Sequence, residues 1–258
     1  MPAPQGKFIW YDVMTTEPKQ GAAFYSHVVG WEAQDFPMSD GSTYTVFRKG
    51  PVMVAGLMAI PDEMLKAGMK PCWSGYIAVD DVDAHAKRIT EAGGTIQRPP
   101  TDIPNVGRFA VAADQGGAVF LIFKPSTDET PVPHEMMAPG RIGWHELNAG
   151  DLDREFGFYA KLFGWTKDQA MDMGPMGTYQ IFAIGGAPSG GMMKRPPQVP
   201  VSCWNYYIGV GSVEAAAARI KERGGQVVMG PQEVPGGAWI VQARDPQGSP
   251  FALISTGK

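Results

Sequence analysis

The sequence predicts an α+β fold, and three observations support this. The chain of 258 residues repeats itself once, so two similar halves account for most of it. Each half alternates short apolar stretches, typical of strands, with stretches whose apolar residues recur at helical spacing. The 33 glycines and 23 prolines supply the turns that many short strands need. Strands that return after one helix and then meander favour curved, antiparallel-rich sheets with helices outside.

The repeat defines the expected domains. Motifs of the first half recur in the second at a nearly constant offset. The segment between the halves is rich in proline and polar residues, which favours a linker. We therefore expect domains at 1–125 and 139–258, joined by a proline-rich linker at 126–138. The matched motifs are Trp10 and Trp144, Phe24-Tyr25 and Phe158-Tyr159, Gly30-Trp31 and Gly164-Trp165, Cys72-Trp73 and Cys203-Trp204, Gly93-Gly94 and Gly224-Gly225, and Asp114 and Asp245.

Each half is expected to contain two units of strand, helix and further strands. The first helices end at Gly30 and Gly164, and the second helices begin after the capping residues Asp81 and Ser212. The expected helices of the first units are 20–29 and 154–163. The expected strands are 7–14, 31–36, 43–49, 52–58, 75–79, 108–112, 119–123, 141–148, 206–210, 239–243 and 251–254.

Composition excludes several classes of function. The net charge is −4 and no basic run occurs, so a nucleic-acid partner is not expected. No apolar run approaches the ~20 residues of a membrane helix, and residues 1–7 lack a signal pattern, so we expect a cytoplasmic protein with no membrane partner. Cys72 and Cys203 are expected to be small buried hydrophobes, with a disulfide or a nucleophile as alternatives.

The repeated motifs resemble those of the vicinal oxygen chelate superfamily, which includes glyoxalase I, bleomycin-resistance proteins and extradiol dioxygenases. The resemblance rests on the Phe-Tyr and Gly-Trp pairs and on Asp245-Pro246-Gln247-Gly248, which is similar to the family's Asp-Pro-x-Gly turn. The first half has Asp114-Gln115-Gly116-Gly117 at that place, without the proline. The resemblance implies two tandem glyoxalase-like domains, each of two βαβββ units forming curved sheets around a cavity. The layout is similar to that of bacterial two-domain glyoxalase-like proteins.

The resemblance also implies where a metal would be held. Family enzymes bind a divalent metal through His and Glu at four strand positions, but none of these positions carries a His or a carboxylate here. The four histidines, His27, His85, His134 and His145, are far apart in sequence. We therefore expect no metal and no cofactor. The eight positions are Trp10, Gly56, Ser74 and Leu121 in the first half, and Trp144, Gly191, Asn205 and Ala252 in the second.

Strand alternation predicts the residues that line the cavities. The expected lining combines aromatic groups with a few polar ones and one acid in each half, which is typical of a small-molecule site. Tyr44 and Tyr179 either join this lining or pack between sheets. The predicted lining residues are Trp10, Asp12, Met14, Ser74 and Tyr76 in the first half, and Trp144, Glu146, Asn148, Asn205 and Tyr207 in the second.

Asp12 and Glu146 are the strongest candidates for functional residues. Burying an acid within an apolar strand costs free energy unless the acid is paired or protonated. Each is a candidate general base and a candidate hydrogen-bond partner for a ligand. An ion pair with an arginine, or a strand end open to water, is the structural alternative. Methionines 171–176 and 192–193 are expected in loops near the opening.

The predicted function is that of a metal-free, glyoxalase/bleomycin-resistance-like protein that binds a small organic molecule in a cavity. The alternative is a lyase, isomerase or dioxygenase-type enzyme that uses Asp12 or Glu146 as acid or base, or a divalent metal at a site not identified. A third interpretation is a scaffold whose cavity is filled by its own side chains. A monomer and a homodimer are both compatible with the sequence.

Overall fold

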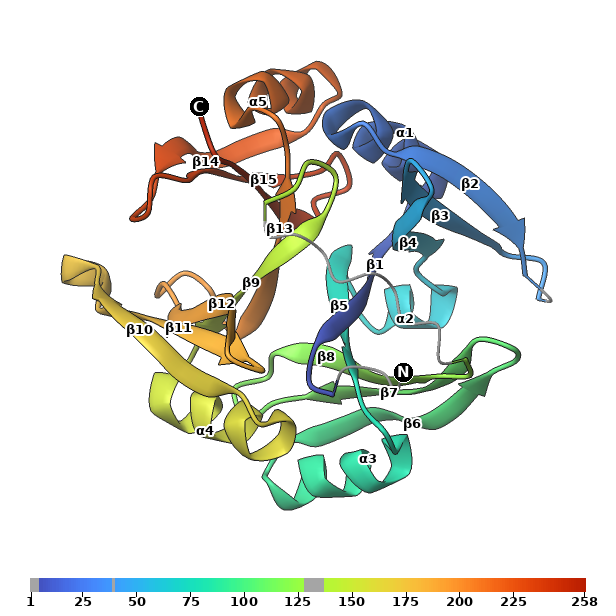
Figure 1. The fold of residues 1–258 in the computed structure, drawn as a ribbon. Helices are drawn as coiled ribbons and strands as arrows, with labels where there is room; N and C mark the ends of the chain where they lie inside the picture. Colours follow the sequence, from blue (N-terminus) through green and yellow to red (C-terminus); the bar gives the residue numbers. More distant parts are fainter. Residues whose placement is uncertain (1–4, 39, 128–136) are drawn as a thin grey trace. The chain divides into compact units, whose positions relative to one another are not determined.

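The computed structural model describes residues 5–38, 40–127 and 137–258, and in this part the chain forms two sheets of eight strands (Figure 1). The first sheet has the order β2-β3-β4-β1-β5-β8-β7-β6 and the second the order β10-β11-β12-β9-β13-β16-β15-β14. The α+β prediction is therefore confirmed. Most neighbouring strands are antiparallel, but β1 pairs with β4, β5 with β8, β9 with β12 and β13 with β16 in parallel.

The elements repeat in the same order in the two halves, except that a short helix α2 follows β4 and a 3-10 turn (Gly174–Met176) follows β10. The first half contains β1 (Phe8–Thr15), α1 (Pro18–Val29), β2 (Glu32–Pro37), β3 (Thr43–Lys49), β4 (Val52–Ala59), α2 (Asp62–Lys66), β5 (Cys72–Ala78), α3 (Val82–Glu91), β6 (Thr95–Ile103), β7 (Gly107–Ala113) and β8 (Val119–Pro125). The second half contains β9 (Ile142–Ala149), α4 (Leu152–Phe163), β10 (Thr166–Asp172), β11 (Thr178–Ile184), β12 (Ala187–Lys194), β13 (Cys203–Gly209), α5 (Val213–Glu222), β14 (Gln226–Glu233), β15 (Trp239–Arg244) and β16 (Pro250–Ser255).

Local chemistry explains where the helices begin and end. The Asp81 carboxylate accepts from the Ala84 amide at the start of α3, and the Ser212 hydroxyl does the same for α5. Gly30 ends α1 with φ of 80° and Gly164 ends α4 with φ of 71°, a left-handed conformation that favours glycine. These caps are the ones that the sequence predicts.

Contacts group the chain into two compact units, each of which combines segments of both halves. Unit 1 contains Met1–Ile9, Ser74–Pro131 and His145–Asn205. Unit 2 contains Trp10–Trp73, Val132–Trp144 and Tyr206–Lys258. The domain boundaries expected from the repeat stay a prediction, and residues 128–136 of the expected linker lie outside the described residues.

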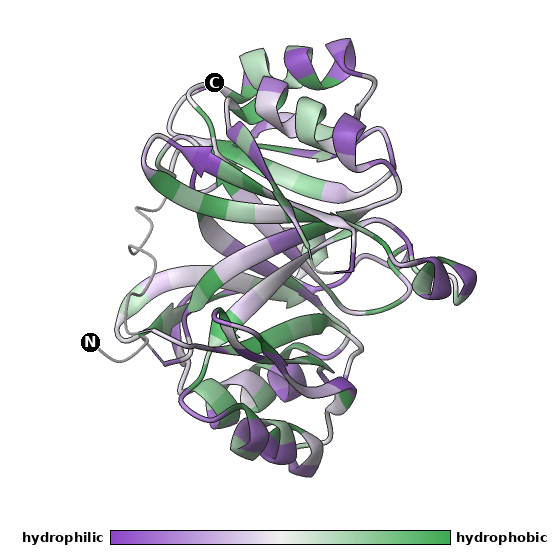
Figure 2. Ribbon diagram, turned by 90° about the vertical axis from the view of Figure 1, so that its right-hand side faces the viewer, coloured by the Kyte–Doolittle hydropathy of each residue, from purple (hydrophilic) through white to green (hydrophobic). Residues whose placement is uncertain are grey.

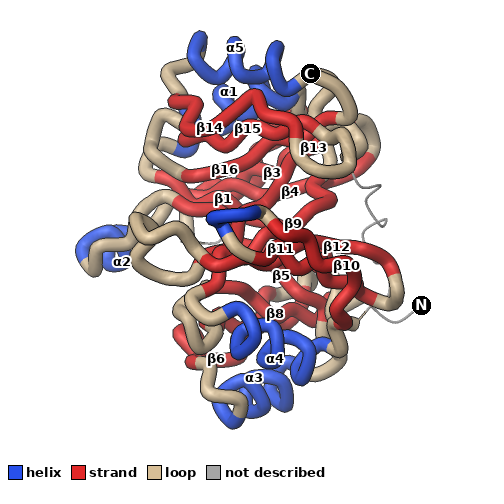
Figure 3. The backbone as a smooth tube through the Cα atoms, turned by 90° about the vertical axis from the view of Figure 1, so that its left-hand side faces the viewer, coloured by secondary structure: helices blue, strands red, loops and turns tan. Residues whose placement is uncertain are grey.

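Within each unit two helices contact each other, α3 with α4 in unit 1 and α1 with α5 in unit 2 (Figure 3). Apolar residues concentrate along the strands, whereas the helices alternate apolar and polar residues (Figure 2). An amphipathic helix buries its apolar stripe against a sheet, so the strands hold most of the core. No helix in the described part of the chain is long and apolar enough to cross a membrane.

The structure differs from the sequence-based expectation at two edge strands and at the cysteines. Strands β6 and β14 were not expected, because their residues are mostly polar and include Pro99, Pro100 and Pro231. Both are edge strands, where prolines are tolerated. Cys72 and Cys203 are free thiols that are only half-buried, so the burial expected of them is partial, and the alternative of a disulfide between them is wrong.

Candidate functional site

Asp12 lies on β1, and its side chain is buried, with 4% of its surface exposed. Its Oδ1 accepts a hydrogen bond of 2.7 Å from the Tyr44 hydroxyl and one of 3.0 Å from the Trp10 indole. The same indole N–H lies 2.8 Å from the Tyr44 oxygen. Burial, followed by the Asp12 charge, raises the pKa of Tyr44 well above its usual value, so the phenol keeps the proton that it donates.

A glycine makes this contact sterically feasible. Strand β4 runs parallel to β1 and pairs Gly56 with Asp12. A Cβ built on Gly56 would collide with the Tyr44 hydroxyl and with Asp12 Oδ1. Tyr44, from β3, therefore crosses over Gly56 to reach the acid. We call Trp10, Asp12, Tyr44 and Gly56 the Asp12 cluster, and all four belong to unit 2.

The second half builds a similar arrangement in unit 1. Glu146 on β9 is buried, and its Oε2 accepts a hydrogen bond of 3.3 Å from the Tyr179 hydroxyl. Gly191 on β12 pairs with Glu146, and a Cβ at Gly191 would collide with the Tyr179 ring. We call Glu146, Tyr179 and Gly191 the Glu146 cluster. Both tyrosines therefore bind the acids, and whether they line a cavity or pack between sheets stays a prediction.

A row of aromatic and methionine side chains lies beside Asp12. Strand register places Phe36, Tyr44, Met58 and Met14 opposite one another across four strands. The adjacent row is Gln34, Val46, Gly56 and Asp12. Residues opposite each other share a face, and the side chains of the aromatic–methionine row are all partly exposed. An apolar strip therefore lies beside a buried carboxylate on one face of the sheet.

The matching row in the second half is Met171, Tyr179, Met193 and Asn148. Met171 lies on β10, and Met192 and Met193 lie on β12, so the expectation that these methionines occupy loops is wrong for all three. Met192 is fully buried, whereas Met171 and Met193 are partly exposed. Only Met173 and Met176 of this group lie outside strands.

The other predicted lining residues are distributed over both units. Ser74 and Tyr76 are buried in unit 1, where Tyr76 packs edge-on against Phe123 at 6.0 Å between ring centres. Asn205, half-buried, also belongs to unit 1. Since Asp12 belongs to unit 2, a wall that joins it to Ser74 and Tyr76 stays a prediction.

Trp144 and Tyr207 come together in unit 2, in a hydrophobic cluster. The buried members are Tyr207, Ile240, Ala252 and Ile254, and Trp144 packs against them. The Tyr207 hydroxyl accepts a hydrogen bond of 3.1 Å from the Gln242 amide. Trp144 therefore packs against this cluster in unit 2, and the Trp10 indole donates to the acid two residues away.

The strand positions at which family enzymes hold a metal offer few donors here. Gly56 and Gly191 have no side chain, and Ala252 lies in the hydrophobic cluster. In the described ranges, no three His, Cys, Asp or Glu side chains are grouped closely enough to hold a metal ion. This donor set does not fit a divalent transition metal, which needs about three protein ligands.

The histidines are engaged elsewhere. His145 stacks on Phe8 at 4.1 Å between ring centres, and its Nδ1 lies 2.7 Å from the Ser189 carbonyl oxygen. His27 lies 3.1 Å from Glu222, and His85 lies 3.0 Å from the Asp81 carbonyl oxygen. The fourth, His134, lies outside the described residues.

The sequence singled out the acids and Trp10, gave Tyr44 two alternative places and gave Gly56 only as a family metal position, so the contact of Tyr44 with Asp12 over Gly56 was not predicted. The signal was present, because Tyr44 and Tyr179 match in the repeat, as do Gly56 and Gly191. Tyr44 lies on β3 and Asp12 on β1, with β4 between them, so their contact can be recognised only when the register of the three strands is known.

Comparisons with known proteins give consistent results. A family model described as "Glyoxalase/Bleomycin resistance protein/Dioxygenase superfamily" matches residues 7–122 and 141–253. "Putative glyoxylase CFP32" of Mycobacterium tuberculosis is 31% identical over 253 residues, which cover 97% of this chain and 95% of the relative. "Anthracycline biosynthesis protein DnrV" of Streptomyces peucetius is 28% identical over 257 residues, which cover 95% of this chain and 91% of the relative.

Solved structures share the fold at low identity. The 2,3-dioxygenase LapB of Pseudomonas sp. KL28 superposes with a TM-score of 0.67 at 13% identity, covering 99% of this chain and 94% of that one. The Mn(II)-bound glyoxalase of Novosphingobium aromaticivorans gives a TM-score of 0.66 at 16% identity, covering 100% of this chain and 83% of that one. At such identities the likeness shows the fold alone.

Proposed function

Given that this chain belongs to the glyoxalase/bleomycin resistance protein/dioxygenase superfamily, we propose that it binds a small hydroxylated aromatic molecule at the Asp12 cluster, without the metal of family enzymes. The observation that carries this proposal is the buried Asp12 carboxylate, hydrogen-bonded to Tyr44 and Trp10. A carboxylate in an apolar setting binds a hydroxyl or amine proton strongly, because water competes little there.

The apolar half of such a ligand matches the aromatic–methionine row. Phe36, Tyr44, Met58 and Met14 span four neighbouring strands, which at the usual strand spacing is about 14 Å. Methionine side chains adapt to flat apolar surfaces, and aromatic rings stack on them. The name of the DnrV relative concerns anthracyclines, which are flat, polycyclic and hydroxylated, and it supports this ligand class.

The absence of a metal is proposed from the donor set. Trp10 is engaged with Asp12, and Gly56 has no side chain, so two of the four family positions of this half supply no ligand atom. The acid then performs by hydrogen bonding the ligand recognition that a metal performs in family enzymes.

The proposal is tested with two soluble probes, alizarin sulfonate, which carries two hydroxyls, and anthraquinone-2-sulfonate, which carries none. Binding is followed by quenching of tryptophan fluorescence in the presence of EDTA. We expect the wild type to prefer the hydroxylated probe, and Asp12→Asn to weaken its binding about tenfold, the equivalent of one charge-assisted hydrogen bond. Equal binding of the two probes to wild type and variant contradicts the proposal.

Glu146→Gln is the matched variant in the other half. The Glu146–Tyr179 hydrogen bond, at 3.3 Å, is longer than the 2.7 Å bond from Tyr44 to Asp12, so we expect a smaller effect than for Asp12→Asn. The larger effect identifies the half that binds the ligand.

An enzyme is the second candidate, favoured by one observation. The Tyr44 hydroxyl, whose pKa is raised, donates a hydrogen bond to Asp12, and such a pair can hold or pass a proton at the Asp12 carboxylate. A lyase or isomerase that uses this proton would turn over a bound substrate, and Asp12→Asn would abolish turnover. A ligand recovered unchanged after long incubation would support binding alone.

A further inference from the structure

Each unit contains a joint in which a helix meets a β-turn. In unit 1, Tyr159 of α4 donates a hydrogen bond of 2.9 Å to Asp114, and the Trp204 indole donates to the same tyrosine. We call this the Asp114 joint, formed by α4, the turn 114–118 and Ser202. Its counterpart in unit 2, the Asp245 joint, is formed by α1, the turn 245–249 and Trp73. The two joints are equivalent in the repeat, but they differ in the side chain that fills the space between helix and turn.

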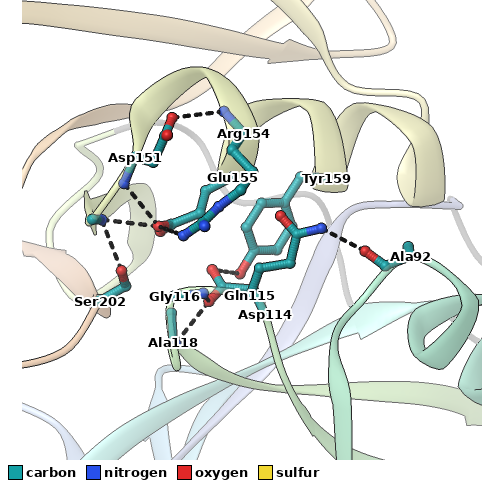
Figure 4. A network of polar contacts seen from close by, with 11 residues as sticks. Ala92, Asp114, Gln115, Gly116, Ala118, Asp151, Arg154, Glu155, Tyr159 and Ser202 are labelled. Atoms are coloured by element: carbon teal, nitrogen blue, oxygen red, sulfur yellow. Dashed lines mark hydrogen bonds and ion pairs between the residues drawn. The ribbon is translucent and has the colours of Figure 1, made fainter.

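In the Asp114 joint that side chain is Glu155, whose contacts are drawn in Figure 4. It is fully buried. Its Oε1 accepts hydrogen bonds from the amides of Gly150 at 2.9 Å and Asp151 at 3.0 Å. Its Oε2 is buried and has no hydrogen-bond partner among the described residues. A Cβ built on Gly116 would collide with Glu155 Oε1 and Ser202 Oγ, so the Glu155 carboxyl lies directly against the turn of Asp114.

In the Asp245 joint the space between helix and turn is filled by a side chain of the turn instead of a side chain of the helix. Gly21 takes the place of Glu155 on the helix, and Gln247 takes the place of Gly116 in the turn. The Gln247 side chain lies over the helix, where its amide donates to Gln20, and its Oε1 would be 3.9 Å from a Cβ at Gly21. A neutral amide therefore accompanies Asp245, whereas a second carboxyl accompanies Asp114.

We propose that the Asp114 joint is a proton-dependent contact: a proton on Asp114, beside the buried Glu155 carboxyl, keeps α4 packed on the turn, and loss of that proton loosens both. The Asp245 joint, with its neutral glutamine, responds less. This inference does not depend on the proposed function, because neither joint contains a residue of the Asp12 or Glu146 cluster.

The physical basis is repulsion between two buried carboxylates, which cannot both ionise without cost. Burial raises the pKa of Asp114 to about 6, and the charge of Glu155 adds to the increase. Asp114 Oδ1 already accepts from the amides of Gly116 and Ala118, and Oδ2 accepts from Tyr159. Both oxygens of Asp114 therefore already accept hydrogen bonds, and ionisation of this carboxyl is opposed first by burial and then by the charge of Glu155.

The charged groups around the pair come from several elements. From α4, Arg154 lies 3.7 Å from Glu155 Oε1 but is half exposed, so water screens it, and Asp151 caps the helix. Arg195, in the segment before β13, lies close to Gly150, whose amide donates to Glu155. Its Nε would be 3.6 Å from a Cβ built on that glycine. From α3, Arg88 donates to carbonyls at the far end of α4, where His85 also lies, and so both are remote from the pair.

The test is hydrogen exchange of the full chain followed by mass spectrometry at about pH 5 and about pH 7.5, with rates corrected for intrinsic exchange. In the wild type we expect protection of peptides covering 114–118 and 150–159 to fall about tenfold or more between the two values. Glu155→Gln keeps the shape of the side chain and removes its charge. In this variant the loss of protection between the two pH values should be no larger than the loss in peptides covering 245–249.

Two further variants complete the test. Asp153→Asn removes an exposed charge from the first turn of α4 and should leave the fall unchanged. Gln247→Glu places a carboxyl beside Asp245 and should create a fall in peptides covering 21–25 and 245–249. The proposal is overturned if Glu155→Gln retains the full fall, or if a folded Gln247→Glu protein shows none.

Discussion

Tyr25 on α1 donates a hydrogen bond of 3.0 Å to Oδ2 of Asp245, which lies 220 residues further along the chain. The Trp73 indole donates to the same hydroxyl at 2.9 Å. Burial raises the pKa of Tyr25 well above its usual value, so it keeps the proton. Tyr25 belongs to the Phe-Tyr motif and Asp245 to the Asp-Pro-x-Gly turn. Two motifs that the sequence shows separately therefore bind each other in unit 2.

Tyr25→Phe should destabilise the protein by about 1–3 kcal/mol, because it leaves a buried carboxylate oxygen and a buried indole N–H without this partner. Urea unfolding followed by circular dichroism measures the change. Asp245→Asn and the double variant complete a double-mutant cycle, in which we expect the double variant to lose less than the two single losses together. Strict additivity would show that the hydrogen bond contributes nothing.

Stability should depend on Asp114 in a defined pH window. The pKa of Asp114 is raised from 3.8 to about 6 in the folded chain, mainly by burial, so the folded state holds this proton more tightly than the unfolded state. The contribution is fully present below about pH 4 and is lost as pH rises through about 6. Relative to Asp114→Asn, the wild type should therefore lose stability between these values.

Thermal unfolding of both proteins across that window measures the effect. Asp40→Asn is the control, because Asp40 is exposed and hydrogen bonds from Ser42 lower its pKa. Relative to Asp40→Asn, the wild type should show no such loss of melting temperature as the pH rises through the window. A wild-type melting temperature that rises relative to Asp114→Asn across the window would refute the assignment.

The repeat and the caps made most of the fold predictable from sequence. Apolar patterning located β1, which is buried on both faces, and α1 and α4, which each bury one face. It failed for β6, which is polar and contains two prolines, because an edge strand is held by backbone hydrogen bonds that leave no apolar pattern. The same limit applies to the site, since only register shows that Tyr44 reaches Asp12 over Gly56.

Metal addition should leave the protein unchanged. A metal that binds the folded state at 100 times its dissociation constant stabilises by about 2.7 kcal/mol, which raises the melting temperature by several degrees. We expect no such rise with Zn²⁺, Ni²⁺, Mn²⁺ or anaerobic Fe²⁺ added to EDTA-treated protein, because the donor set does not fit these ions. A saturable rise with any one of them, absent after re-addition of EDTA, would contradict the metal-free proposal.

Gly56→Ala should damage the Asp12 cluster selectively. The added methyl collides with the Tyr44 hydroxyl and with Asp12 Oδ1, so Tyr44 has to leave the acid or β4 has to shift, at a cost of about 1–3 kcal/mol.

Binding of alizarin sulfonate to Gly56→Ala should weaken about tenfold or more, while the circular dichroism spectrum is retained. Gly157→Ala is the matched control, because Gly157 lies on α4 with nothing within 4 Å of the added methyl. This second alanine should stabilise the helix by about 0.5–1 kcal/mol and leave binding unchanged. If the two alanines had the same effect on binding, the contact of Tyr44 with Asp12 would have no part in recognising the ligand.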